Sequence, residues 1–184
     1  MDWLQLILFL VVVMLLTKPV GIYLFQVLNP SEKTFLDPLF RPVERWIYRV
    51  AGIDPVLEQD WKGYLMSLLA FSLISAIFVY LILAFQYYLP LNPQKFGAPS
   101  WDLNLNTSLS FMTNTNWQNY GGESTMSYLS QMAALTVQNF VSPAVGLGAA
   151  ATLVRGMARQ SAHTIGNFWV DLVRICLYLL LPFS

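Results

Sequence analysis

Two long uncharged runs of hydrophobic residues, 64–89 and 124–154, bracket a polar stretch at 104–123, and this order constrains the fold more than any other feature of the chain. Each run exceeds the roughly 20 residues that an α-helix needs to cross a bilayer. The segment at 103–112 can form only about three helical turns, which is too short to cross. We therefore expect a membrane helix, a short re-entrant helix, a polar loop and a second membrane helix.

The loop at 113–118 is polar but has no formal charge. Non-helical backbone at membrane depth is tolerated only where it is buried in protein or lines a water-filled path. Backbone carbonyls supported by Thr and Asn side chains can replace the hydration shell of a large monovalent cation, and the short helix directs the negative end of its dipole toward the same place. The pattern predicts one strand of a potassium selectivity filter, with the candidate residues Thr113, Asn114, Thr115, Asn116 and Gln118. An Asn- and Thr-rich extracytoplasmic loop is the alternative interpretation.

Composition supports a membrane protein. Hydrophobic residues make up 56% of the 184 residues and charged residues 11%, against about 25% charged residues in an average soluble domain. The predicted fold class is therefore an all-α integral membrane protein. The formal net charge of zero gives no indication of a nucleic-acid partner, and the single cysteine, Cys176, allows no internal disulfide.

The N-terminal part of the chain predicts a transmembrane helix at 1–28, followed by a cytoplasmic connection at 29–63. Within the connection, residues 42–50 have the pattern of a short amphipathic helix. Its apolar face contains Val43, Trp46, Ile47 and Val50. We expect this face to lie on the membrane surface, and a docking face for a partner is the alternative.

The run at 124–154 is longer than a perpendicular crossing requires, so we expect it to be tilted or broken near Pro143. Gln131, Gln138 and Asn139 fall on one face of a regular helix. Polar side chains at membrane depth should face protein or water. They predict either contacts between helices or the wall of a vestibule below the filter.

A second cytoplasmic connection is predicted at 155–167, with His163 at the surface. A further helix starts near residue 168, and only ten residues without charge follow Arg174. Ten residues cannot cross a bilayer. We therefore expect 168–184 to be the start of a second repeat and the chain to be part of a longer protein.

Charge asymmetry predicts the orientation. Nine of the ten basic residues fall in the segments on one side of this layout, and Lys95 alone falls on the filter side. Because cytoplasmic loops are rich in Lys and Arg, we expect a multi-pass protein with its N-terminus and filter outside.

Five runs are specific enough to indicate a family. They are SFMTNTNWQNYGGE at 110–123, SYLSQMAALTVQNF at 127–140, YLPLNPQ at 88–94, SWDLNLNT at 100–107 and NFWVDLVRI at 167–175. Together they closely resemble the KdpA family, the potassium-transporting component of the bacterial Kdp P-type ATPase. The resemblance is collinear from about residue 3 to the last residue.

The resemblance implies four pore-forming repeats around a pseudo-fourfold axis, preceded by one extra helix. This chain would supply the extra helix, the first repeat at 64–154 and the start of the second. The first filter strand would be 113–118, with Asn114, Thr115 and Asn116 as the best-matched potassium ligands and Gln118 at the rim.

The resemblance also implies a bacterial cytoplasmic (inner) membrane protein with K⁺ as the transported ion. Its partners would be KdpB, the catalytic P-type ATPase chain, together with KdpC and KdpF of the Kdp complex. This chain has no phosphate-binding loop and no phosphorylatable aspartate motif, so we expect a non-catalytic subunit with no ATP site. The alternatives are a truncated, non-conducting membrane fragment and a passive Trk/Ktr-type potassium carrier subunit.

Overall fold

The computed structural model describes residues 2–159 and 163–184. Met1 of the predicted first helix and residues 160–162 of the second connection lie outside the described residues. The described part of the chain forms helices and no strand. Three of these helices, Trp3–Leu28, Trp61–Phe85 and Ser130–Ala158, are long and apolar enough to cross a membrane. The predicted class, an all-α integral membrane protein, is confirmed.

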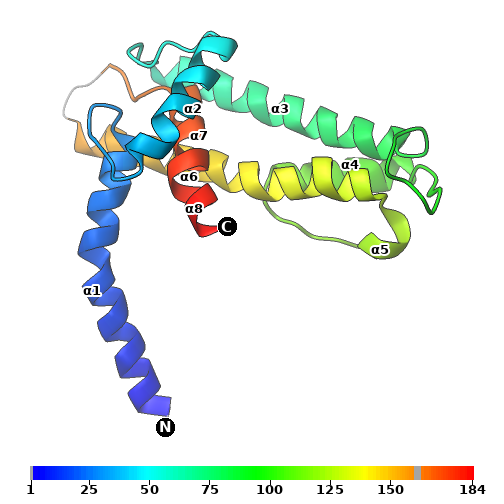
Figure 1. The fold of residues 1–184 in the computed structure, drawn as a ribbon, viewed down its shortest axis with the longest axis horizontal. Helices are drawn as coiled ribbons and strands as arrows, with labels where there is room; N and C mark the ends of the chain where they lie inside the picture. The colour runs from blue at the N-terminus through cyan, green and yellow to red at the C-terminus, as the bar shows by residue number, and fades with distance from the viewer. Residues whose placement is uncertain (1, 160–162) are drawn as a thin grey trace. The chain divides into compact units, whose positions relative to one another are not determined.

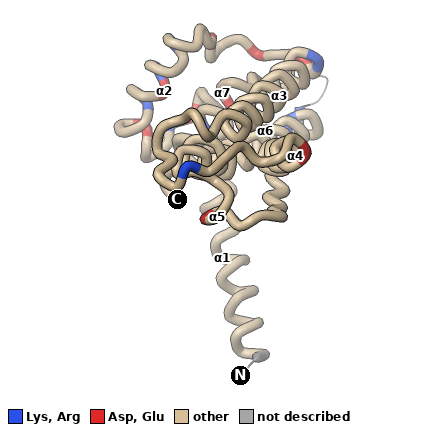
Figure 2. Tube along the Cα trace, turned by 90° about the vertical axis from the view of Figure 1, so that its right-hand side faces the viewer, with Lys and Arg blue, Asp and Glu red and all other residues tan. Residues whose placement is uncertain are grey.

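The chain divides into two compact units, Met1–Val56 together with Val173–Ser184, and Leu57–Leu172. The first unit contains α1 (Asp2–Leu28), α2 (Asp37–Ala51), the end of α7 (Phe168–Arg174), the π-helix η2 (Ile175–Leu180) and α8 (Leu181–Phe183). α1 continues as one helix through Pro19. α2 has charges of both signs (Figure 2) and ends at Gly52, whose left-handed backbone lets its N–H bond to the carbonyl of Tyr48.

α2 starts five residues before the predicted segment at 42–50 and buries a face that we did not predict. Phe40, Glu44 and Tyr48 are buried, whereas the predicted apolar face is mostly exposed, with Trp46 at 62%. An exposed apolar face on a charged helix agrees with contact to the membrane surface, and that interpretation stays a prediction.

Glu44 can be buried because its carboxylate is fully partnered. Its Oε1 accepts a hydrogen bond from Arg174 Nη1 at 3.0 Å and from the hydroxyl of Tyr48 at 2.9 Å, and its Oε2 accepts from the hydroxyl of Tyr178 at 2.7 Å. Arg174 Nε also donates to the carbonyl of Val27 at 2.6 Å, at the end of α1. These bonds join α1, α2 and the C-terminal helix within the first unit.

The second unit contains α3 (Trp61–Phe85), α4 (Trp101–Met112), α5 (Gly122–Thr125), the π-helix η1 (Ser130–Thr136), α6 (Val137–Ala158) and residues 168–172 of α7. α3 and the η1–α6 helix lie side by side, and α4 packs against both (Figure 1). α4 begins near the end of α3, and the extended chain after α4 returns to α5 at that same end (Figure 1). Between them lies a core that includes Val79, Leu83, Phe111, Met126 and Ala134.

Helix ends in the second unit differ from the predicted boundaries for local reasons. α3 starts at Trp61, three residues before the predicted start, because Asp60 accepts a hydrogen bond from the N–H of Gly63 at 2.8 Å and caps the helix. α3 also ends at Phe85, four residues before the predicted end. α4 starts two residues before its predicted start and ends at Met112, as in the prediction.

The third membrane helix was predicted to be tilted or broken near Pro143. It is not broken there, since α6 runs through this residue, and the tilt stays a prediction. Membrane helices tolerate proline where neighbouring groups satisfy the freed backbone. The irregularity lies upstream instead, where residues 126–127 are not helical and η1 is π-helical. Ser127 starts the helix there, because its Oγ accepts a hydrogen bond from the N–H of Ser130 at 3.1 Å.

Candidate functional site

The backbone of residues 113–117 is held by the last turn of α4. The N–H groups of Thr115 and Asn116 donate to the carbonyl oxygen of Ser110 at 2.9 and 3.2 Å. The hydroxyl of Ser110 donates to the carbonyl of Trp117 at 3.1 Å. Residues 113–117 of the predicted filter strand are therefore fixed directly on the carboxyl end of the short helix.

Two residues of this strand have left-handed backbone, Asn114 with φ 57° and Asn116 with φ 55°. Asparagine is one of the few non-glycine residues that adopt this conformation readily. Within the described residues, no donor reaches the carbonyl oxygens of residues 113–116. The N–H groups of the strand thus donate hydrogen bonds to α4, whereas its carbonyl oxygens accept none from the described residues.

Side chains that are two residues apart in the strand contact each other. The hydroxyls of Thr113 and Thr115 lie 2.8 Å apart, and Thr113 Oγ1 also donates to the carbonyl of Leu109 at 2.9 Å. Asn116 Nδ2 donates to Asn114 Oδ1 at 3.2 Å. The structure therefore brings together four of the five predicted site residues, and all four are exposed.

Gln118, the fifth predicted residue, lies apart from the other four. Its side chain is exposed. It makes no hydrogen bond to any described residue. The rim position that the resemblance implies for Gln118 stays a prediction.

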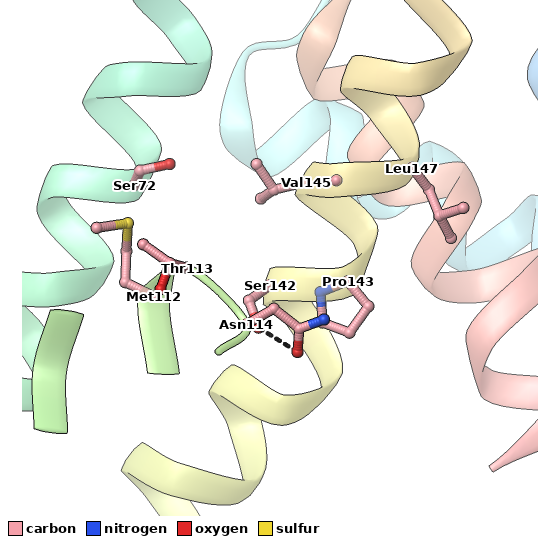
Figure 3. Close-up of a pocket in the computed structure, with 9 residues that line it drawn as sticks. Ser72, Met112, Thr113, Asn114, Ser142, Pro143, Val145 and Leu147 are labelled. Atoms are coloured by element: carbon pink, nitrogen blue, oxygen red, sulfur yellow. Dashed lines mark hydrogen bonds between the residues drawn. The ribbon is translucent and has the colours of Figure 1, made fainter. Parts of the chain in front are cut away.

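A pocket of about 600 Å³ lies beside the first residues of the strand, next to the end of α4 (Figure 3). Met112, Thr113 and Asn114 line it from the end of α4, and Ser72 lines it from α3. α6 contributes the rest of the wall, which is formed by Ser142, Pro143, Val145, Gly146 and Leu147. The wall is neutral, so the pocket offers apolar surface and hydroxyl groups and no fixed charge.

The hydroxyl of Ser142 connects α6 to the strand. Its Oγ lies 3.4 Å from Asn114 Oδ1 (Figure 3) and donates to the carbonyl of Gln138 at 2.6 Å. A hydroxyl has one proton to donate. The short bond to Gln138 commits this proton, so the longer contact with Asn114 is the weaker of the two.

The pocket is not lined by the three amide residues for which we predicted either contacts between helices or a vestibule wall. These residues are Gln131, Gln138 and Asn139. Gln138 is buried, Asn139 is exposed, and Gln131 Nε2 donates to the carbonyls of Gly122 and Met126 at 3.3 and 3.1 Å. The three residues therefore do not share one environment.

Three residues of this region were missed by sequence reasoning: Ser110, Ser142 and Gln86. Serines in membrane helices are common, so neither serine gave a signal. Gln86 did give one, because an amide near the end of an otherwise apolar run must find partners if it is buried. It is fully buried, at 0% exposure.

The strand contains the kinds of oxygen that can replace the hydration shell of a monovalent cation. It offers neutral carbonyl, hydroxyl and carboxamide oxygens, and the described residues contain no cluster of three or more His, Cys, Asp or Glu that could hold a metal ion. A long apolar helix, a short helix, a polar strand and a second long apolar helix follow one another here, which is the order predicted for one repeat of a pore-loop membrane protein.

Comparison with known proteins then identifies the family. Residues 7–184 match the family described as potassium-transporting ATPase A subunit, and the chain belongs to this family. It is 53% identical over its whole length to a potassium-transporting ATPase potassium-binding subunit from Granulibacter bethesdensis. It is 54% identical over 98% of its length to that subunit from Methylorubrum populi, and 49% identical over 99% to that from Koribacter versatilis.

The chain spans about a third of the length of these relatives, 32% of the first two and 31% of the third. The matched part contains the whole of the described site.

Proposed function

We propose that this chain supplies the first potassium-selecting strand of the potassium-binding subunit of an ATP-driven potassium uptake complex. The observation that supports the proposal is the row of carbonyls at 113–116. These carbonyls accept no hydrogen bond within the described residues, whereas the N–H groups of Thr115 and Asn116 are bonded to Ser110. A strand of this kind can present its oxygens to an ion in place of water.

The electrostatics of the strand favour a monovalent cation. α4 ends at Met112, so its negative dipole end lies at the strand. The strand has no fixed charge, and fixed carboxylates would hold divalent ions more strongly. In the proposal, Thr113, Asn114, Thr115, Asn116 and Gln118 line the potassium path, and the neutral pocket beside Ser142 receives the ion after the filter.

The proposal extends to orientation and partners. The charge asymmetry of the sequence favours a filter that faces the extracytoplasmic side of the bacterial inner membrane, with the N-terminus outside. One strand does not close a pore, so the remaining strands must come from outside residues 1–184. ATP hydrolysis belongs to a separate catalytic chain, KdpB, and KdpC and KdpF complete the complex.

The test needs a complete pump. Residues 1–184 would replace the matching third of the Granulibacter bethesdensis protein, and this chimera would be produced with its partner chains. Gln118→Lys then places an ammonium about 5 Å from the entering ion, where the repulsion is roughly 3 kcal/mol at an effective dielectric near 20. Solvent and salt at the rim reduce this repulsion by about half or more.

We expect Gln118→Lys to raise the half-saturating potassium concentration of the ATPase by about 10-fold to 100-fold, at about 1.4 kcal/mol per tenfold. Turnover at saturating potassium should change much less. The matched control is Gln94→Lys, which changes an exposed amide in the loop before α4. An unchanged half-saturation for Gln118→Lys in an intact complex would remove Gln118 from the ion path.

A further inference from the structure

The carboxamide of Gln86 lies just beyond the end of α3 and uses both of its polar atoms inside the protein. Its Nε2 donates to the carbonyls of Gly97 and Thr125, at 2.5 and 3.0 Å. Its Oε1 accepts from the N–H of Ser127 at 3.1 Å and from the hydroxyl of Ser130 at 2.9 Å. The side chain is fully buried, so these four bonds replace all of its contacts with water.

The partners of Gln86 belong to the segments that lead into and out of the proposed filter. Gly97 precedes α4, and Thr125 and Ser127 belong to residues 119–127, which we call the return segment. Ser130 opens η1, where Ser127 caps the helix. One side chain therefore connects α3 to three other parts of the second unit.

Other contacts of the return segment make it compact. Gln131 donates to the carbonyls of Gly122 and Met126. Gly121 approaches Ser124 so closely that a Cβ atom at position 121 would lie 2.7 Å from Ser124 Oγ. The return segment is thus a folded unit, and Gln86 and Gln131 attach it to the two neighbouring helices.

The two ends of the filter strand are held differently. Its inner end is bonded to Ser110, as far as Trp117. Between Gln118 and Tyr120 no hydrogen bond to another described residue holds the backbone. The outer end is therefore placed by the return segment, and the return segment is placed by Gln86 and Gln131.

We propose that Gln86 is a positioning residue for potassium binding, because it fixes the return segment and with it the outer end of the strand at Gln118. The inference rests on the proposed function. Gln86 does not touch the ion path itself. A binding constellation loses affinity when its supporting residues let it move by a fraction of an ångström.

The test uses two variants of Gln86 in the chimeric pump. Gln86→Leu removes all four bonds, and Gln86→Glu keeps an acceptor for Ser127 and Ser130 but loses both donated bonds. The matched control is Gln59→Leu. Gln59 precedes α3 at its other end, where Oε1 accepts from the N–H of Phe168 at 2.9 Å and Nε2 donates to Ser67 at 2.9 Å. A general loss of stability would affect both positions alike.

Two readouts separate positioning from stability. We expect Gln86→Leu to raise the half-saturating potassium concentration by about 3-fold to 30-fold, the range of indirect coupling effects, with turnover at saturating potassium nearly unchanged. Gln86→Glu should give a smaller shift, and Gln59→Leu almost none. Hydrogen–deuterium exchange should quicken in residues 119–130 for the Gln86 variants and in residues 164–168 for Gln59→Leu.

The inference would be overturned if active complexes of Gln86→Leu and Gln59→Leu had the same half-saturating potassium concentration. Unchanged exchange in residues 119–130 of Gln86→Leu would also overturn it, and this measurement needs no transport. If the unmodified chimera shows no potassium-stimulated ATPase, the proposed function fails, while exchange still decides whether Gln86 holds the return segment. Where Gln86→Leu does not assemble, Ser130→Ala removes one bond to Gln86, together with the contact between the Ser130 and Ser127 hydroxyls, and should give the same changes at smaller size.

Discussion

The guanidinium of Arg155 faces the carboxylate of Asp171, with Nη1 2.5 Å from Oδ2 and Nη2 2.7 Å from Oδ1. Asp171 is 2% exposed and Arg155 15%. The hydroxyl of Tyr64 lies 3.0 Å from both Asp171 Oδ2 and the carbonyl of Gly148. This ion pair joins the end of α6 to the start of α7. The hydroxyl of Tyr64 connects α3 to both of these helices.

The buried pair predicts a non-additive stability effect. Loss of one partner leaves an unpaired buried charge, which costs about 3–5 kcal/mol. Asp171→Asn should therefore lower the unfolding temperature of the detergent-solubilised chain clearly. Arg155→Leu with Asp171→Leu should recover most of the loss, because a buried ion pair is often replaceable by apolar residues. A double variant less stable than Asp171→Asn would contradict this account.

A second ion pair predicts a pH dependence. Hydrogen bonds from Arg159 and Thr164 lower the pKa of Glu58 below its ordinary value. A carboxyl group with a lowered folded-state pKa stabilises the fold above its unfolded value of about 4.3 and loses that contribution as pH falls through the folded value. Glu58 is 40% exposed, so the contribution is about 0.5 kcal/mol or less.

The measurement is the unfolding temperature of the original chain and of Glu58→Gln at two pH values. The original chain should be slightly more stable at pH 7, and the difference should shrink as pH falls below the unfolded pKa and through the lower folded-state pKa. The same difference at both pH values would show that Glu58 stabilises the fold without its charge.

Hydrophobic periodicity was enough to predict most of this architecture. The long apolar runs predicted α3 and the η1–α6 helix. The short segment before the polar loop predicted α4 and its end at Met112. These features depend on residues close together in the sequence. The bonds of Gln86 do not, because they join it to residues 11 to 44 positions away.

The details of the site were harder to predict for the same reason. The left-handed backbone at Asn114 and Asn116 depends on how the strand bonds back to Ser110. The π-helical turns of η1 and the passage of α6 through Pro143 depend on packing against neighbouring helices. The sequence indicated a polar ion path at 113–118 but not which oxygens are free.

Two substitutions at Asn116 can distinguish a role of its backbone carbonyl from a role of its side chain, because the backbone there is left-handed. Asn116→Gly keeps the left-handed conformation at no steric cost, whereas Asn116→Ala adds about 1–2 kcal/mol of strain. In the chimeric pump, the half-saturating potassium concentration should stay within about threefold for glycine and rise about 5-fold to 30-fold for alanine. An equal rise in the half-saturating potassium concentration in both variants would indicate that the side-chain carboxamide of Asn116, and not its backbone carbonyl, binds the ion.

The orientation predicts different access to two exposed positions. Lys95 lies in the loop before α4 and Arg45 on α2, and both are exposed. In a Cys176→Ser background, a membrane-impermeant thiol reagent should label Lys95→Cys in intact cells and should label Arg45→Cys only after permeabilisation. Labelling of Arg45→Cys from outside would reverse the proposed topology.

The central claim is that the backbone oxygens of 113–116 hold the transported ion. The most direct test is an experimental structure of the complete chimeric complex in rubidium, whose anomalous scattering marks its position. We predict an anomalous peak in direct coordination with carbonyl oxygens of Thr113, Asn114, Thr115 or Asn116. A rubidium-loaded, active complex with peaks elsewhere and none at this strand would contradict the claim.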